Sequence, residues 1–456
     1  MRAHVILALG VAAAAASASS CSWTRFDDLR GDAKARALGD PFGSADFGGM
    51  LAVAKAKMAG GRPSLLAANP GLKGNIAFYS FTEAGSADEL KMRGGADTTD
   101  DQSKLATTSA PLSGIAAAPD GDMAALLGNK TSQVKRLYLI NFDVNGKPSG
   151  QAFATPQFTP GWGDNGLAMG DVYRPIITDT ADVATDTVVL GERELFIFPQ
   201  KGGGSTVGRC KLTTVLTSGR IAIADMVAGV DNFAEVIVGA QYAGGPGDVT
   251  LYAMGDIDPP KLISDSLNES AKTCTVRGTK ITAPAAEPSF GKMIAVAQVI
   301  GGPELDLIVG APGENVVYIF AGSATGPLSA NPKMIRPGST GGFGSAATAV
   351  DFDGDGKNEL AVGEPAFVPP GGSSEAGRVL IYGIQADTPT LVMPALTARD
   401  FDSEHFGRAL TAIRFTAAGK TVDQLVVGEQ EAVIVYFDTN LRDTASGVVD
   451  ADERVR

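Results

Sequence analysis

A short pattern recurs along this chain and restricts its fold more than any other feature. Each copy is a β-rich apolar run that ends near a Gly or Ala corner, followed by a turn and a second aliphatic or aromatic run. Seven such pairs are present: 65–71 with 75–81, 123–128 with 136–142, 187–191 with 194–198, 235–240 with 248–252, 306–312 with 315–320, 359–365 with 378–382, and 423–428 with 432–437. Internal repeats of this kind indicate modules that bury their hydrophobic faces against one another.

Several copies are preceded by an aromatic residue and a Gly. These pairs are Phe47-Gly48, Trp162-Gly163, Phe290-Gly291, Phe343-Gly344 and Phe406-Gly407. The apolar runs are rich in β-branched and aromatic residues, and no amphipathic helix of useful length lies between them. The pattern therefore predicts an all-β fold, a seven-bladed β-propeller whose radial packing leaves only short sheet edges.

One copy also carries acids at alternate positions of a single loop. Asp351, Asp353, Asp355 and Glu359 supply carboxylates, and Lys357 supplies a backbone carbonyl. Oxygen donors at this spacing suit a hard dication such as Ca²⁺, whereas the same acids without a cation would repel one another. We therefore predict one structural Ca²⁺ with these five residues as ligands.

The flanks of this loop separate it from an EF-hand. An EF-hand has a helix on each side and an acid at loop position twelve, but position twelve here is Val362, within a strand-like run. With Phe343-Gly344 ahead and Val362-Gly363-Glu364-Pro365 behind, this copy resembles the FG-GAP repeat of integrin α-chain β-propellers. Glu359 departs from the Asp that is most frequent in that family, yet its longer arm still carries a carboxylate. The resemblance implies a propeller and leaves the bound partner open.

The N-terminus has the features of an export signal. Arg2 is followed by an apolar run from Val5 to Ala16, and small residues at 18–20 directly precede Cys21. A charged start, a short apolar core and small residues at a cleavage site are typical of a secretory signal. The residues before Cys21 resemble the lipobox of bacterial lipoproteins, which implies lipidation of Cys21 and anchoring to the cell envelope, where we favour the outer membrane. The alternative is an ordinary signal peptide with an incidental Cys.

These features divide the chain into four parts. We expect a lipoprotein signal at 1–20, a tether after the lipidated Cys at 21–41, the propeller at 42–440, and a C-terminal tail or closing strand at 441–456. A closed ring of sheets needs a blade completed from both ends of the chain or another lock. Either the tether or residues 446–450 would serve, and the sequence does not choose between them.

Charge and cysteine content narrow the partners. The formal net charge is −13, and removal of Arg2 with the signal makes it −14, so we expect no binding to nucleic acid and no membrane attachment other than the lipid. If Cys21 is lipidated, Cys210 and Cys274 remain. A disulfide between them would close a loop of 64 residues (274 minus 210) and stabilise the fold by about 4 kcal/mol. Two buried free thiols are the alternative.

Other polar residues give no catalytic constellation. His405 lies in a turn ahead of a blade, and we interpret it as a surface histidine. The acids of the other copies lack the spacing of a cation loop, and we expect them to be solvated. These are Asp171, Asp179, Asp182, Asp186, Asp225, Asp231, Glu235, Glu304 and Asp306. Exposed Phe367 and Val368, on the proline-rich loop 365–377, form a candidate contact surface.

Two classes of function remain. By analogy with the repeat family, we expect a non-enzymatic, monomeric platform that binds a protein or glycan at the cell surface. The alternative is a polysaccharide hydrolase or lyase that uses carboxylates around the central channel. A pocket with two carboxylates about 5–10 Å apart would favour such an enzyme. A sugar-binding lectin would instead show similar pockets recurring between blades.

Overall fold

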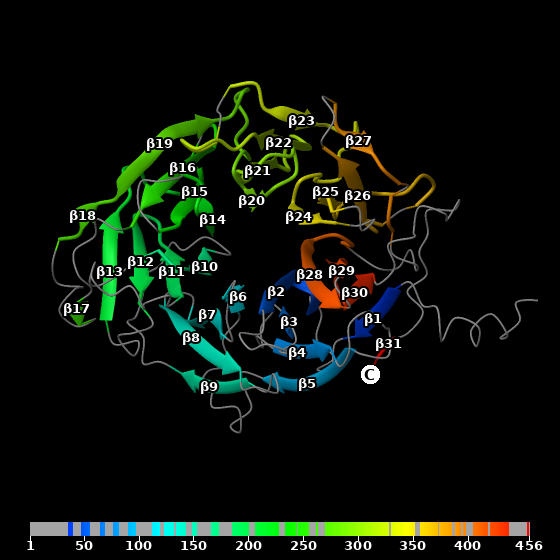
Figure 1. The fold of residues 1–456 in the computed structure, drawn as a ribbon, viewed down its shortest axis with the longest axis horizontal. Coiled ribbons are helices and arrows are strands. Elements are labelled where there is room, and N and C mark those ends of the chain that lie inside the picture. The colour runs from blue at the N-terminus through cyan, green and yellow to red at the C-terminus, as the bar shows by residue number, and fades with distance from the viewer. Residues whose placement is uncertain are drawn as a thin grey trace, which may run out of the picture.

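The computed structural model describes residues 35–436 and 454–455, with its longest gaps at 97–111, 153–165 and 173–184. The described strands form seven sheets, almost all of whose strand pairs are antiparallel. Figure 1 shows that the sheets stand around a central axis. Among the described residues the only helical element is one 3-10 turn, η1 (Phe47–Gly49). The predicted all-β propeller is confirmed.

The first strand of each sheet lines the axis. These strands are β2 (Met50–Ala54), β6 (Leu112–Ala117), β10 (Leu167–Gly170), β14 (Ser218–Ala224), β20 (Met293–Ala297), β24 (Ala346–Val350) and β28 (Ala409–Ala417). Each contacts the next, and β28 contacts β2, so that the ring is closed at its centre.

The second and third strands form the core of each sheet. The second strands are β3 (Ser64–Ala68), β7 (Met123–Thr131), β11 (Asp186–Leu190), β15 (Glu235–Gln241), β21 (Asp306–Ala311), β25 (Glu359–Glu364) and β29 (Lys420–Gly428). The third strands are β4 (Ile76–Phe81), β8 (Val134–Phe142), β12 (Glu194–Phe198), β16 (Asp248–Ala253), β22 (Val316–Phe320), β26 (Arg378–Gly383) and β30 (Ala432–Tyr436). They coincide with the seven pairs of runs in the sequence. Every residue of β15, β16, β21 and β22 is buried, because neighbouring sheets cover both faces.

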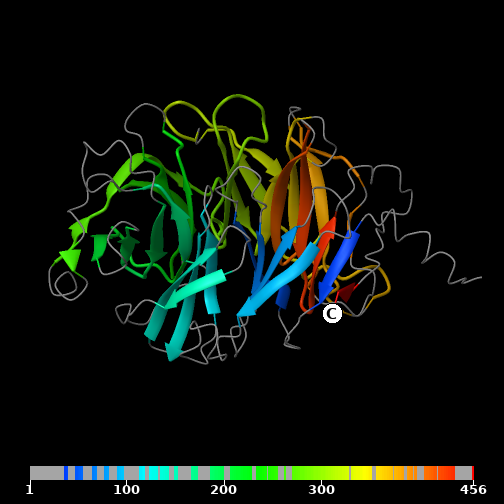
Figure 2. The same ribbon diagram turned by 60° about the horizontal axis from the view of Figure 1, so that its bottom comes forward.

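The fourth strands form the outer edge. They are β5 (Leu90–Ala96), β9 (Pro148–Ala152), β13 (Thr206–Lys211), β19 (Thr275–Thr282), β23 (Lys333–Ile335) and β27 (Thr390–Leu391). In the last sheet this place is taken by β1 (Ala35–Gly39), which pairs antiparallel with β30. Residues assigned to the tether therefore complete the last sheet, and β31 (Arg454–Val455) pairs parallel with β1 beyond it. Figures 1 and 2 both show the first strand beside the last ones.

Glycines explain how neighbouring sheets come close. The Gly of an aromatic-Gly pair donates its N–H to the corner glycine of its own sheet, as Gly344 does to Gly363 (3.0 Å) and Gly407 to Gly428 (3.0 Å). Its carbonyl then lies against the corner glycine of the preceding sheet, where a Cβ on Gly363 would be 1.9 Å from the oxygen of Gly407. A residue with a side chain cannot occupy either position, so the repeated glycines follow from backbone contact between sheets.

The same contact joins the first and last sheets. A Cβ on Gly428 would lie 2.0 Å from the oxygen of Gly48. The four described aromatic residues of these pairs, Phe47, Phe290, Phe343 and Phe406, are fully buried. Phe47 packs with Ile413 and Val433 of the last sheet. The junction between the two ends of the chain is therefore built like those within it.

A disulfide links two further sheets. The chain leaves β16, forms β17 (Lys261–Leu262) and β18 (Lys272–Thr273) along β13 of the preceding sheet, and returns as β19. Cys210 of β13 and Cys274, directly after β18, are bonded, with their Cα atoms 4.9 Å apart. Both are buried. The disulfide was one of the two outcomes left open by the sequence, and it clamps this excursion to the preceding sheet.

None of the helices among the described residues is long and apolar enough to cross a membrane.

Candidate functional site

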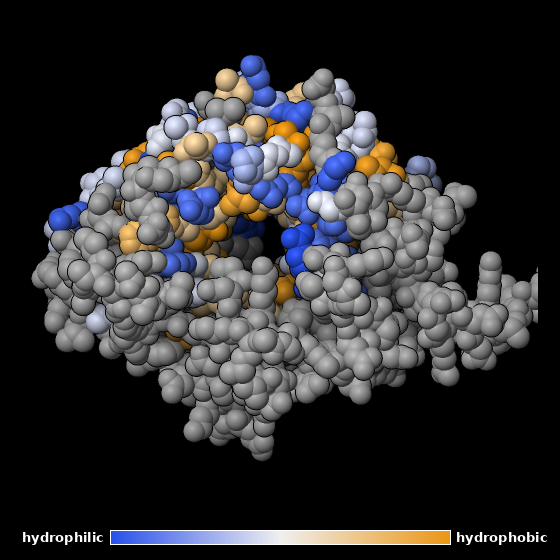
Figure 3. All heavy atoms as spheres, viewed as in Figure 1, coloured by the Kyte–Doolittle hydropathy of each residue, from blue (hydrophilic) through white to orange (hydrophobic). Residues whose placement is uncertain are grey.

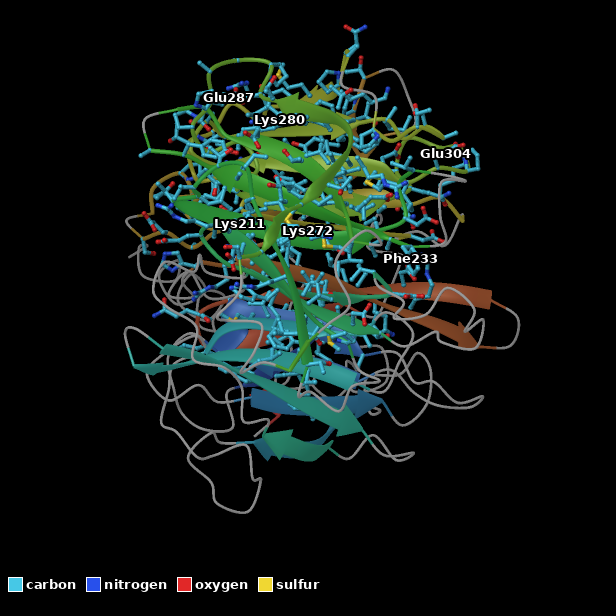
Figure 4. The ribbon with its side chains drawn as sticks, turned by 90° about the vertical axis from the view of Figure 1, so that its left-hand side faces the viewer. Lys211, Phe233, Lys272, Lys280, Glu287 and Glu304 are labelled. Atoms are coloured by element: carbon cyan, nitrogen blue, oxygen red, sulfur yellow. A yellow bond between two sulfur atoms is a disulfide. The ribbon has the colours of Figure 1, made fainter. Side chains whose placement is uncertain are left out.

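The acidic loop, residues 351–359, connects β24 to β25. First strands run into second strands at one end of the ring. Figure 4 shows Phe233 and Glu304, from two such connections, on the same side of the molecule, and Glu287 on the opposite side. Of the predicted ligands, Asp351 and Glu359 are buried and Lys357 is exposed. Asp353 and Asp355 lie outside the described residues.

The neck of the loop is closed by backbone bonds. Glu359 pairs with Val350 across β24 and β25, so that the carboxylates of Asp351 and Glu359 extend from adjoining positions of the neck. The N–H of Gly356 donates to Oδ2 of Asp351 (3.1 Å) and folds the chain back toward it. Gly356 has a φ of +84° with open space around it, a conformation that other residues adopt only with strain.

The loop is also tied to both neighbouring sheets. Asn358 donates from Nδ2 to the carbonyl of Gln298 (2.8 Å) in the preceding sheet. The N–H of Asp351 donates to Oδ2 of Asp423 (3.1 Å) in the following sheet. Arg414 holds Asp423 with two hydrogen bonds of 2.7 Å and also reaches Oδ1 of Asn358 (3.3 Å). The conformation of the loop is therefore coupled to three sheets at once.

The charges around the neck are mixed. The hydrogen bonds that Arg414 donates to Asp423 raise the pKa of Arg414, burial lowers it, and the negative charges of Asp423 and Asp351 raise it further. The result is a pKa above the usual value for arginine, so that a fixed positive charge lies beside the first acid of the loop. It offsets part of the repulsion among the acids.

The described part of the loop fits a calcium ion in its chemistry. Asp351 and Glu359 are buried carboxylates at the two ends of a short turn, and Ca²⁺ prefers such oxygen donors. Within the described residues no group of three His, Cys, Asp or Glu side chains is placed to hold a metal, so the chemistry of the loop rests on two placed acids and two that are known from the sequence alone. Bound calcium would neutralise these acids and stiffen the turn.

Acids equivalent to Glu359 open the second strand of other sheets and cap the preceding loop. Asp306 accepts from the N–H groups of Val299 and Ile300 (both 2.8 Å) at Oδ2 and from that of Gly322 (3.0 Å) at Oδ1. Asp186 and Glu235 bind the N–H groups of Val172 (3.1 Å) and Met226 (2.9 Å). Burial raises the pKa of Glu235, and its hydrogen bond to Met226 opposes that rise.

The expectation that these acids are solvated is wrong for Asp186, Glu235 and Asp306, which are all at most 3% exposed. Asp225 is exposed, as expected, and Asp179, Asp182 and Asp231 lie outside the described residues. Each buried acid stands directly before the apolar run of a second strand, at the position of Glu359. This shared position is visible when the copies are aligned on their second strands, whereas the spacing of a cation loop does not reveal it.

Two further expectations concern surface residues. His405 lies in a turn with a φ of +62°, its side chain is 40% exposed, and Nε2 is 3.1 Å from Oε2 of Glu375, in agreement with its interpretation as a surface histidine. Val368 is exposed, but Phe367 is only half-exposed, because its ring stacks on the guanidinium of Arg378 (3.7 Å from Cζ to the ring centre). The predicted contact surface is therefore smaller than the sequence indicated.

The centre of the ring is hollow on the face shown in Figure 3, with hydrophilic side chains on the side of the rim where β24 and β28 lie. The described inner strands consist of Ala, Val, Ile, Leu, Met, Gly, Ser and Thr, together with one phenylalanine, Phe415, and two arginines. Arg220 and Arg414 are therefore the only charged residues in the described strands β2, β6, β10, β14, β20, β24 and β28. No carboxylate is contributed by these strands.

Comparison with known proteins identifies a repeat family and distant likenesses among solved structures. The FG-GAP repeat profile matches residues 343–382, which span the aromatic-Gly pair, β24, the acidic loop, β25 and most of β26. The chain therefore carries an FG-GAP repeat.

Among solved structures, a candidate 6-phosphogluconolactonase from Bacteroides fragilis NCTC 9343 is similar at 12% identity and a TM-score of 0.45, over 82% of this chain and 89% of that one. The Tc holotoxin pore of Photorhabdus luminescens is similar at 14% identity and a TM-score of 0.37, over 87% of this chain and 17% of that one. At these identities and scores the likeness does not extend to function.

Proposed function

We propose that this FG-GAP propeller is a non-enzymatic binding platform, anchored to the cell envelope by a lipid on Cys21, that presents a rigid surface to a protein or glycan. Calcium bound by Asp351, Asp353, Asp355, Glu359 and the carbonyl of Lys357 would serve a structural role. The single observation that carries this proposal is the use made of the buried acids in the second strands. Asp186, Glu235 and Asp306 accept hydrogen bonds from backbone N–H groups, and Asp423 accepts them from Arg414.

The buried acids at the acidic-loop end are the natural candidates for catalysis. Asp306 binds three backbone N–H groups, and Asp423 binds Arg414 and the N–H of Asp351. A general acid or base needs an oxygen that reaches the substrate, and these carboxylates are committed to holding loops. The described inner strands add no acid to the channel. Together these features favour binding over polysaccharide cleavage.

The acidic loop gives the platform a defined structural function. Its ties to Gln298, Asp423 and Arg414 connect three sheets at one end of the ring. A cation that fixes the acidic loop would therefore fix the relative positions of the three sheets at this end of the ring, which is the surface presented to a partner. Calcium loops in extracellular modules bind with a Kd of about 10⁻⁴–10⁻³ M, so occupancy would follow the calcium concentration outside the cell.

The test is affinity capture of the full chain from intact envelopes, in calcium and in chelator, with an Asp353→Ala/Asp355→Ala variant in parallel. We expect the same envelope component to be recovered in calcium and lost or reduced both in chelator and with the variant. A Gly338→Ala variant, altered in an open position outside both the acidic loop and the loop 365–377, is the matched control and should capture normally.

Two results would count against the proposal. Turnover of a polysaccharide by the purified chain would show that it is an enzyme. Unchanged capture by the double variant would show that the ion is not needed for binding. The anchor is tested separately: a Cys21→Ala variant should be released from the membrane fraction, and its retention there would exclude lipid attachment at this residue.

A further inference from the structure

A hollow of about 350 Å³ opens at the outer side of the ring between two neighbouring sheets. One wall is β19, with Arg277, Gly278 and Thr279; the other is the turn after β22, with Thr325, Gly326 and Pro327. Leu251 of β16 forms the floor. The volume lies at the small end of the range of ligand pockets, which is roughly 300–1,000 Å³.

An irregularity in the sheet creates this hollow. β16 and β19 pair regularly at Val249 with Ile281 and again at Leu251 with Arg277, so that three residues of β19 stand opposite one of β16. Gly278, within this bulge, has a φ of +68°. Bulges of this kind bend a strand and redirect its side chains, and they are frequent next to functional sites.

The opposite wall is a turn that its own hydrogen bonds hold. Ser323 donates from Oγ to the carbonyl of Gly326 (2.6 Å), and Gly326 adopts a φ of +103°. Thr325 is exposed at the tip of this turn, and its Oγ1 lies 3.2 Å from Oγ of Ser323. The walls are therefore shaped before any ligand binds, which lowers the entropy lost on binding.

The lining combines one cation, two hydroxyl groups and an apolar floor. The guanidinium of Arg277 provides a planar fork that matches a carboxylate. Thr279 offers a hydroxyl that donates and accepts. The hydroxyl of Thr325 is bonded to Oγ of Ser323 (3.2 Å) and still accepts, while Pro327 offers carbon surface above the buried Leu251.

A buried acid of the same sheet interacts with this cation and limits the charge of the ligand. Arg277 is close enough to Glu235 to lower the pKa of that carboxyl, against the larger effect of burial. The positive charge of Arg277 is therefore partly offset from within the protein. A ligand with one negative charge fits this balance, whereas a phosphate dianion would be repelled by Glu235.

We propose that this hollow binds a small hydroxylated carboxylate of the size of a single sugar acid, with its carboxylate on Arg277, its hydroxyl groups on Thr279 and Thr325, and its carbon face on Pro327. This inference rests on the proposed binding function and specifies a ligand class for it. The site lies away from the acidic loop, and the ligand binds there without calcium.

The test measures binding of D-glucuronate to the full chain by calorimetry or ligand-observed NMR, with D-glucose, acetate and inorganic phosphate as comparisons. We expect glucuronate to bind most tightly, because glucose lacks the carboxylate, acetate lacks the hydroxyl groups, and phosphate carries excess charge. Binding of glucose equal to that of glucuronate, or tighter binding of phosphate, would overturn the assignment.

Variants then locate the site. Arg277→Met should weaken glucuronate binding by about tenfold or more, the value of a charged hydrogen bond, and Thr325→Val should weaken it by a smaller factor. Lys211→Met removes a positive charge from an exposed position on the same side of the ring and is the matched control (Figure 4). It should leave binding unchanged. If Arg277→Met does not fold, Thr325→Val decides, since Thr325 is exposed at a turn.

The outcomes separate this inference from the proposed function. Retained envelope capture by Arg277→Met, together with no binding of glucuronate to the unaltered chain, would overturn the hollow alone. Conversion of glucuronate-containing polymers to smaller products would overturn the non-enzymatic function itself. Binding of glucuronate that survives Arg277→Met, Thr325→Val and chelator equally would place the ligand elsewhere and overturn the assignment of this site.

Discussion

Two junctions between neighbouring sheets are closed by different means. Where β24–β27 meets the sheet of β28–β30, backbone lies on backbone: Gly407 fits against Gly363. Where β10–β13 meets the sheet of β14–β19, no aromatic-Gly pair precedes the inner strand, and Gly219 meets the side chain of Leu190 instead. There the chain crosses between the sheets and is held by the disulfide.

The difference shows what the repeat motif contributes. An aromatic-Gly pair provides a buried ring and a glycine that fits between two corner glycines. A junction without the pair lacks this contact, and a covalent bond at the outer edge supplies a connection of another kind. The disulfide acts on the unfolded chain as well, because it restricts the loop it closes.

Removal of the covalent connection should have the largest effect. The double variant Cys210→Ala/Cys274→Ala should lose about 4 kcal/mol of unfolding free energy, the value for a loop of 64 residues in the chain-entropy model. Urea unfolding measures it. The unaltered chain should lose a similar amount in reductant, and the variant should not respond to reductant. Equal midpoints for oxidised and reduced protein would show that the disulfide junction does not depend on its bond.

The glycine junction is tested by one methyl group. Gly363→Ala would place a Cβ 1.9 Å from the oxygen of Gly407, and we expect a loss of about 3 kcal/mol, the upper part of the range for overpacking. The matched control is Gly371→Ala, which has a φ of +81° but nothing within 4 Å. It should cost about 1 kcal/mol from backbone strain alone. Similar urea midpoints for the two variants would refute the close-contact explanation.

Much of this architecture could be predicted from the sequence. The seven pairs of apolar runs coincide with the second and third strands, because burial on both faces leaves a continuous apolar signal. The outer strands were harder to predict, since β19 and β27 are mostly exposed and carry little hydrophobic pattern. The strand that completes the last sheet was left open, because Ala35–Gly39 is short and its partner is almost 400 residues away in sequence.

The candidate sites divide in the same way. Local spacing predicted the acidic loop, whose two placed acids are buried at its neck. The role of Asp306 as a cap depends on where Val299, Ile300 and Gly322 come to lie, which spacing does not show. The hollow at Arg277 depends on a bulge between two strands. Features that depend on the register between strands cannot be predicted from the spacing of residues in the sequence.

A third prediction contrasts a capping acid with the acidic loop. Asp306→Ala removes the acceptor of three backbone N–H groups in the sheet that precedes the loop, and we expect a loss of about 2 kcal/mol, as for a helix cap or a buried unsatisfied donor. This loss should be the same in calcium and in chelator. Glu359→Ala, at the equivalent position, should lose stability mainly in calcium. Identical calcium responses of the two variants would remove the distinction.

The smallest expected effect is a change in how the unfolding free energy depends on high pH, and it concerns one buried tyrosine at each of the two junctions. Tyr318 lies 5.7 Å from Phe290, between ring centres, at a glycine junction, and Tyr252 packs near Cys210 and Cys274 at the disulfide junction. Burial first, and then the hydrogen bond to Glu287, raises the pKa of Tyr318 to about 12, and burial raises that of Tyr252 above its usual value of 10.0.

A phenol whose pKa is raised in the folded state stabilises the fold fully below its unfolded pKa of about 10. That contribution is lost as the pH rises from there through the folded value of about 12 for Tyr318. Tyr318→Phe should therefore show a flatter decline of unfolding free energy above pH 10 than the unaltered chain, measured by urea unfolding at several pH values. Tyr252→Phe should flatten it in the same direction. A steeper decline in either variant would mean that its phenol ionises more readily in the folded chain than in the unfolded one, and that the ring at that junction is not shielded from water as its burial indicates.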